Sequence, residues 1–153
     1  MRRKLLIVLS WTAVVLICFF IFEMSGTVAT DSSEQSSYLI AVIQKIFGVT
    51  FTDFVIRKFA HMFEFALLGF FSAMAFCYTF KKVRKIYLAF LFSFLYAVSD
   101  EIHQLFVLGR AGQIRDVFID TAGILLGLGL MLASYKIVLH LGAKKNGSKH
   151  QSH

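Results

Sequence analysis

The sequence has no proline, so no bend or break in a helix can be attributed to that residue. It is also poor in charge: 16% of its 153 residues are charged, whereas a soluble domain carries roughly 25%. Only two cysteines are present, Cys18 and Cys77, in separate apolar stretches. Those stretches would hold the two thiols very roughly 20 Å apart in depth, so no disulfide between them is expected. The low content of charged residues excludes an ordinary soluble domain.

Long apolar runs dominate the chain instead. Hydrophobic residues make up 58% of it, and its mean hydropathy is +0.71. Four runs are long enough to cross a bilayer, which takes about 18 residues or more; they cover about 5–22, 59–80, 86–107 and 117–139. They predict an all-α fold: an integral membrane four-helix bundle formed by one domain over residues 1–143, followed by a disordered basic tail over 144–153. The shorter apolar stretch at 38–47 cannot span and predicts a short interfacial helix in the first outer loop.

The first apolar run has two interpretations. A basic start, an apolar middle and the small residues Thr27-Val28-Ala29 are typical of a signal peptide with its cleavage site. The run is longer than the apolar region of a usual signal peptide, which favours a retained membrane anchor. The four-span prediction assumes that this segment is retained.

Basic residues predict the orientation of the bundle. The net charge of +7 does not indicate nucleic-acid binding, because the basic residues cluster just beyond the ends of the apolar runs. They gather at the N-terminus, between the second and third runs, and in the tail. With four spans these three regions share one side, and the positive-inside rule makes that side cytoplasmic. Both termini are therefore predicted to be cytoplasmic, with the turns around residues 23–57 and 108–115 outside.

Ionisable and amide residues within the last three runs gather near their predicted outer ends, whereas the inner halves are almost purely apolar. An ionisable group at the centre of a membrane helix costs at least ~2.5 kcal/mol, so such groups persist where they face each other, water or a ligand. Helical spacing places several of them on shared faces, and Gly123 and Gly127 should let another helix approach closely. The set comprises Arg57, His61 and Glu64; Asp100, Glu101, His103 and Gln104; and Asp116 and Asp120.

These residue types suit acid–base chemistry, metal binding or recognition of a phosphate. We predict Glu64, Asp100, Glu101 and His103 as catalytic groups. Substrate binding is assigned to Arg57, His61, Gln104, Arg110, Asp116 and Asp120. A divalent metal is an open alternative, with His61, Glu64, Asp100 and His103 as candidate ligands, although no strict metal-binding spacing is present. A structural salt-bridge network without a ligand also stays open, and snorkelling alone could account for the outermost cations.

The same residues resemble the VanZ-like family of small bacterial membrane proteins. The resemblance rests on three motifs, RKFAHMFEFALLG at 57–69, YAVSDEIHQLF at 96–106 with Gly109-Arg110 after it, and DVFIDTAG at 116–123 with Gly127 after it. It implies a multi-pass protein of the bacterial cell membrane. The founding member is linked to low-level resistance to the glycopeptide teicoplanin, but the family implies no settled reaction.

Two functions follow as hypotheses. In the first, the protein is an enzyme, a hydrolase or transferase, that acts at the outer leaflet on a membrane lipid or a lipid-linked envelope precursor through the acid and histidine cluster. In the second, it is a non-enzymatic envelope module that alters glycopeptide access or binds a membrane partner. An ion path is disfavoured because the inner halves of the spans carry almost no polar residues. The sequence does not determine the substrate or the oligomeric state.

Overall fold

The computed structural model describes residues 2–27, 38, 40–42, 44–46, 52–110 and 112–150, with residues 2, 53 and 141–150 described by their backbone only. The described part is helical and contains no strand. Its long helices are α1 (Arg2–Gly26), α3 (Asp53–Phe80), α4 (Ile86–Gln104) and α5 (Ile114–His150), with a short 3₁₀ helix, η1 (Val83–Lys85), before α4. The predicted all-α four-helix bundle is confirmed.

All four long helices are long and apolar enough to cross a membrane. The candidate spans are Arg3–Gly26, Phe54–Phe80, Val83–Gln104 and Ile114–His140, and the shortest of them has 22 residues. At 1.5 Å per residue that span is about 33 Å long, slightly more than the hydrocarbon core of a bilayer. Of the predicted interfacial helix over 38–47, residues 38, 40–42 and 44–46 are described and are helical. The rest of that segment and Val28-Ala29 of the possible cleavage site lie outside the described residues.

Three helix ends differ from the predicted ones. α3 begins six residues before its apolar run, at Asp53, because Thr52 caps it by accepting a hydrogen bond from the Val55 backbone N–H at 3.4 Å. α1 continues past its apolar run to Gly26. α5 continues to His150, through residues for which the composition favoured a disordered tail. No proline interrupts this stretch, and its three lysines are good helix formers.

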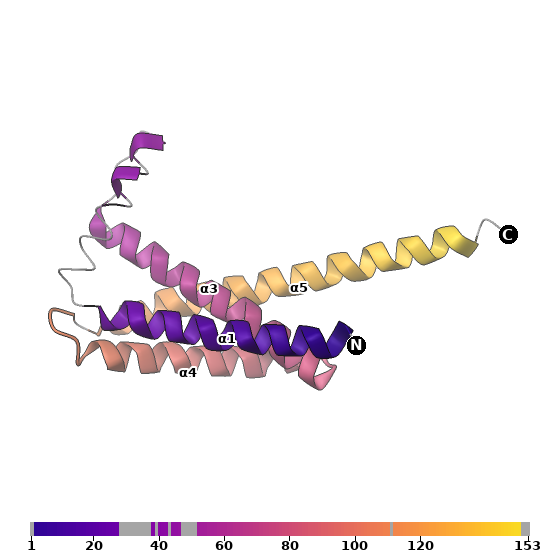
Figure 1. Ribbon diagram of the computed structural model, residues 1–153, viewed down its shortest axis with the longest axis horizontal. Helices are drawn as coiled ribbons and strands as arrows, with labels where there is room; N and C mark the ends of the chain where they lie inside the picture. Colours follow the sequence, from indigo (N-terminus) through magenta and orange to yellow (C-terminus); the bar gives the residue numbers. More distant parts are fainter. Residues whose placement is uncertain are drawn as a thin grey trace.

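Helix α3 is the central element, because it packs against α1, α4 and α5, most extensively against α5 (Figure 1). The predicted close approach at Gly123 and Gly127 is confirmed: a Cβ at Gly123 would meet the backbone oxygen of Met62, and one at Gly127 that of Ala66. Around this crossing the side chains of Phe65, Leu68 and Ile124 are fully buried. Much of α1, in contrast, exposes apolar side chains, as expected of a helix that faces lipid.

The two ends of the bundle differ in composition. Figure 1 shows the N-terminus, the turn between α3 and α4, and the C-terminus toward one end of the molecule. The turn between α4 and α5 and the beginning of α3 lie toward the other end. The three basic regions of the sequence therefore share one end, hereafter the basic end. The opposite end, hereafter the site end, carries the polar residues singled out above.

Candidate functional site

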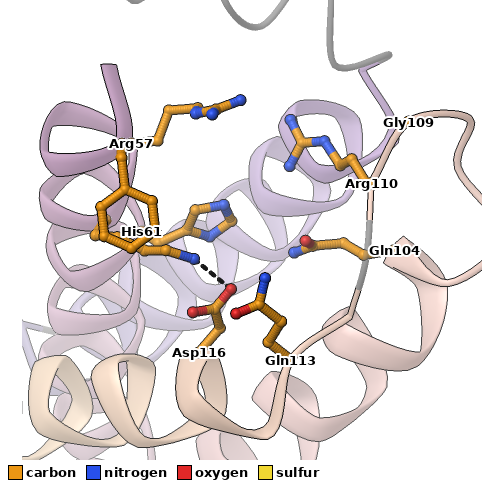
Figure 2. Close-up of a pocket in the computed structure, with 9 residues that line it drawn as sticks. Arg57, His61, Gln104, Gly109, Arg110, Gln113 and Asp116 are labelled. Atoms are coloured by element: carbon orange, nitrogen blue, oxygen red, sulfur yellow. Dashed lines mark hydrogen bonds and ion pairs between the residues drawn. The ribbon is translucent and has the colours of Figure 1, made fainter. Parts of the chain in front are cut away.

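A cavity of about 230 Å³ opens at the site end of the bundle. Four of its lining residues come from the first turns of α3, one from the end of α4, three from the following turn and one from the start of α5. They are Phe54, Arg57, Lys58, His61, Gln104, Gly109, Arg110, Gln113 and Asp116. Figure 2 shows the side chains of Arg57 and Arg110 extending toward one another across the cavity. Three cations from two separate segments thus surround one small volume.

The α3 wall of the cavity follows from helical spacing. Arg57, His61 and Glu64 stand at i, i+4 and i+7, which places them along one face. His61 lines the cavity, and its Nδ1 lies 3.9 Å from Oε2 of Glu64, which is buried behind it. On the neighbouring face Lys58 forms an ion pair with Asp116 at the start of α5. This pair ties the first turns of α3 and α5 together beside the cavity.

A layer of buried carboxylates lies behind the cavity. Asp100 is 4% exposed, and its Oδ2 accepts hydrogen bonds from Ser25 Oγ and from Gln104 Nε2, both at 2.9 Å. Glu101 is 7% exposed, and its Oε2 accepts a hydrogen bond from the backbone N–H of Gln113 at 2.8 Å. These bonds connect the end of α4 both to α1 and to the turn that leads into α5.

Arg110 lines the cavity and also caps the C-terminal end of α1. Its Nε and Nη2 donate hydrogen bonds to the carbonyl oxygens of Thr27 and Met24, at 2.9 and 3.0 Å, where α1 ends. Gly109 before it has a φ of 77°, in the left-handed region that glycine adopts without strain. Burial lowers the pKa of Arg110 and nearby Arg57 lowers it further, whereas the carboxylates of the buried layer raise it. The guanidinium therefore sits between a second cation and a set of acids.

The predicted site residues separate into three groups. Five of the six predicted substrate-binding residues line the cavity: Arg57, His61, Gln104, Arg110 and Asp116. Glu64, Asp100, Glu101 and Asp120 are buried and do not line it, and neither oxygen of Asp120 has a hydrogen-bond partner within the described residues. His103 turns toward α1 instead, where its ring stacks on Phe22 with centroids 4.3 Å apart. The structure thus brings His61, rather than His103, to the cavity.

The geometry of the described residues does not support the hypothesis of a metal site. Among the residues that the structure describes, no group of three or more His, Cys, Asp or Glu side chains is arranged so that it could hold a metal ion. Of the four candidate ligands, His61 and Glu64 are neighbours, but the ring of His103 packs against Phe22 on another helix. The arrangement is better suited to holding an anion beside a histidine.

Sequence reasoning missed several contributors to the site. Ser25 and the carbonyl groups of α1 belong to it because α1 extends to Gly26 and lies beside α4. Gln113 supplies a backbone N–H to Glu101, and its side chain lines the cavity. The only signal for Gln113 was its place in the Gly-Arg turn, three residues before Asp116. Nothing in a single sequence shows that Ser25 faces Asp100.

Four membrane-length helices that enclose buried acids at one end, beneath a cavity walled by cations, define a helical membrane protein with a polar site at one end of its bundle. The model of the VanZ/LLP1 family matches residues 8–138, and the chain belongs to this family. The matched range includes every residue that lines the cavity. No curated protein and no solved structure matched the chain in the corresponding comparisons.

Proposed function

We propose that this VanZ-like protein binds the phosphate-bearing head group of a lipid or lipid-linked envelope substrate in the cavity at its site end, and that it acts on this group as a hydrolase or transferase. The observation that supports the proposal is the convergence of Arg57, Lys58 and Arg110 on one cavity that also contains His61. Guanidinium groups are well suited to phosphate because their N–H donors match its oxygens. The adjoining helices are apolar, so the rest of the ligand would lie in the membrane.

The charge asymmetry of the bundle supports an outward-facing cavity in the bacterial cell membrane. The basic end carries Arg2, Arg3 and Lys4, the four cations between residues 81 and 85, and the lysines of the tail. By the positive-inside rule this end is cytoplasmic, which places the cavity at the outer leaflet. A lipid-linked envelope precursor that has crossed the membrane would present its phosphate at this level.

His61 is the group we assign to proton transfer. A histidine can act as general acid or base near neutral pH, and the carboxylate of Glu64 lies 3.9 Å from Nδ1 of His61, where a negative charge favours the protonated ring although no hydrogen bond joins the two groups. In this assignment the two arginines hold the phosphate while His61 moves a proton to or from the reacting oxygen. Asp100 and Glu101 act as positioning residues, because their oxygens hold Gln104 and the turn before α5.

Glycopeptide susceptibility is the cellular property we connect with this activity. A protein that alters a lipid-linked envelope precursor would change the amount of target that teicoplanin meets. Raised expression of the wild type, compared with the His61→Asn variant, is expected to reduce susceptibility to teicoplanin, measured as the minimal inhibitory concentration. If both proteins have the same effect, the alternative of a non-enzymatic envelope module is favoured.

Binding of a polyprenyl phosphate to the full chain in detergent tests the proposal directly, with the unphosphorylated polyprenol of equal length as the reference ligand. We expect the phosphate to bind more tightly and Arg57→Gln to weaken its binding by about 10-fold or more, since a hydrogen bond to a charged group contributes about 1.5–3 kcal/mol. Arg115→Gln is the matched control, because it removes the same charge from an exposed position that does not line the cavity. Equal binding of phosphate and alcohol, or equal effects of the two variants, would contradict the proposal.

A further inference from the structure

A second cavity, also of about 230 Å³, lies at the basic end of the bundle. Three of the residues that line it are cations, Arg3, Lys81 and Lys82, and two are tyrosines, Tyr78 and Tyr135. None of its lining residues is acidic. Tyrosines and cations at the ends of membrane helices are typical of the level of the lipid head groups. The cavity therefore combines positive charge with a position at the membrane surface.

An apolar groove between α3 and α5 adjoins this cavity. It has a volume of about 280 Å³ and shares Tyr78, Met131 and Tyr135 with the cavity. Its remaining walls include Phe70 and Met74 of α3. Phe70 lies eight residues before Tyr78, which corresponds to about 12 Å along the helix axis. The cavity and groove together, hereafter the basic-end site, lead from a cationic opening to an apolar channel between α3 and α5.

The crossing of α3 and α5 explains why this space exists. Gly123 and Gly127 bring the two helices together in the half of the bundle nearer the site end, where the Met62 and Ala66 backbones touch them. Beyond this crossing the helices diverge, and Figure 1 shows α5 leaving the bundle toward the basic end. Because the two helices touch near the site end and diverge beyond the crossing, a space remains between them toward the basic end.

Backbone carbonyl groups hold the Arg3 side chain in the basic-end site. Arg3 Nη2 donates hydrogen bonds to the carbonyl oxygens of Tyr78 and Thr79, at 2.7 and 3.2 Å, and Arg3 Nε donates to that of Tyr78 at 3.1 Å. Lys81 ends α3 in the left-handed conformation, with a φ of 56°. The hydrogen bonds keep the Arg3 guanidinium at the cavity, which Lys81 and Lys82 also line.

We propose that the basic-end site holds one anionic phospholipid, with its phosphate against Arg3, Lys81 and Lys82 and one acyl chain in the groove between α3 and α5. Charge complementarity identifies the head group, because basic pockets between membrane helices bind anionic lipid heads. The adjoining apolar groove identifies a lipid rather than a free phosphate as the source. This ligand is separate from the substrate proposed above, which binds at the opposite end of the bundle.

Native mass spectrometry of the full chain, titrated in detergent with phosphatidylglycerol or with phosphatidylcholine of the same chains, tests the proposal. The wild type is expected to bind one phosphatidylglycerol with clear preference. Lys81→Asn combined with Lys82→Gln should weaken this binding by about 30-fold, which is about 2 kcal/mol for two cations near a lipid surface. Asparagine at position 81 removes the charge while tolerating the left-handed backbone. The wild-type comparison needs no variant to fold, so equal binding of the two lipids overturns the proposal by itself.

Two matched controls distinguish lipid binding at the basic-end site from unspecific attraction between an anionic lipid and the cations of the protein. Arg84→Gln with Lys136→Gln removes two exposed cations that line neither part of the site and should leave binding unchanged. Ser134→Trp should fill the groove and reduce binding at least 10-fold, whereas Ile137→Trp, on an exposed face outside the groove, should not. Equal losses in the test and control variants overturn the proposal. A dimer that forms without lipid and disappears in Ser134→Trp would overturn it too, because a second copy of the chain would then be the occupant.

Discussion

Gln104 is the residue at which the cavity and the buried acids meet. Its amide nitrogen lies 2.9 Å from Asp100 Oδ2, and it lies 3.5 Å both from Glu101 Oε1 and from Ser25 Oγ. A glutamine amide carries two N–H donors, so one uncharged side chain can satisfy two neighbouring acceptors. The same residue is a wall of the cavity. Its donors therefore hold the carboxylates in place without adding a charge beside the arginines.

Replacement of Gln104 by glutamate should destabilise the fold. The change removes the donors and places a third acid beside Asp100 and Glu101, so we expect the free energy of unfolding to fall by about 2–3 kcal/mol. Denaturant titration in mild detergent measures this value, with fluorescence of Trp11, the only tryptophan, as the signal. Gln113→Glu is the matched control, because it makes the same change at an exposed side chain of the same cavity. Equal losses in the two variants would show that the donor role of Gln104 is not the cause.

At the scale of elements, the contact between α3 and α5 depends on glycines, which have no side chain. A Cβ at Gly127 would overlap the backbone of Ala66 and Phe70, and a Cβ at Gly69 would lie 2.6 Å from the backbone oxygen of Ile124. Backbone atoms cannot move aside as a flexible side chain can. Close packing of this kind drives the association of helices in membranes, where the hydrophobic effect between them is absent. The position of the cavity thus depends on glycines two to three turns away from it.

Gly127→Ala should separate α3 from α5, whereas Gly129→Ala should not. Overpacking a close contact costs about 1–3 kcal/mol, and we expect Gly127→Ala to lower the free energy of unfolding by this amount and to weaken binding at the cavity. A Cβ at Gly129 meets no atom within 4 Å, so the same substitution there should be neutral or stabilise the helix by up to about 1 kcal/mol. Unfolding titrations of the two variants test the pair. An unchanged stability in Gly127→Ala would mean that the helices can slide apart at no cost.

The elements also show which features of the fold a single sequence can predict. Periodicity identified the shared face of Arg57, His61 and Glu64, because positions on one helix are related by fixed geometry. It correctly placed glycines at a close approach, since few other roles need two of them one turn apart. It could not show that His103 would stack on Phe22, because that depends on the rotation of α4 against α1. Pairing between helices is set by packing, which leaves no periodic trace in either segment.

At the scale of the whole molecule, the two ends of the bundle have different charge patterns. The acidic residues of the spans gather at the site end. Within the described residues, few negative charges therefore balance the cations of the basic end. At the site end, cations and acids face each other around and behind the cavity. The positive-inside rule depends on how many lysines and arginines lie in the short loops on each side of the membrane. Acidic residues have little influence on it. In the proposed orientation, the basic end therefore outweighs Arg110 and Arg115, the two cations of the turn between α4 and α5.

The proposed orientation can be tested by labelling engineered cysteines in intact cells. In a background with Cys18→Ser and Cys77→Ser, we expect a membrane-impermeant maleimide to label Leu108→Cys and to leave Arg84→Cys unlabelled until the cells are opened. Leu108 is 83% exposed in the turn between α4 and α5, and Arg84 is exposed in the turn between α3 and α4, so burial does not limit either reaction. The reverse pattern would place the cavity at the cytoplasmic leaflet. Its ligand would then have to be a phosphate-bearing lipid that has not yet crossed the membrane, and the cations of the basic end would face outward against the positive-inside rule.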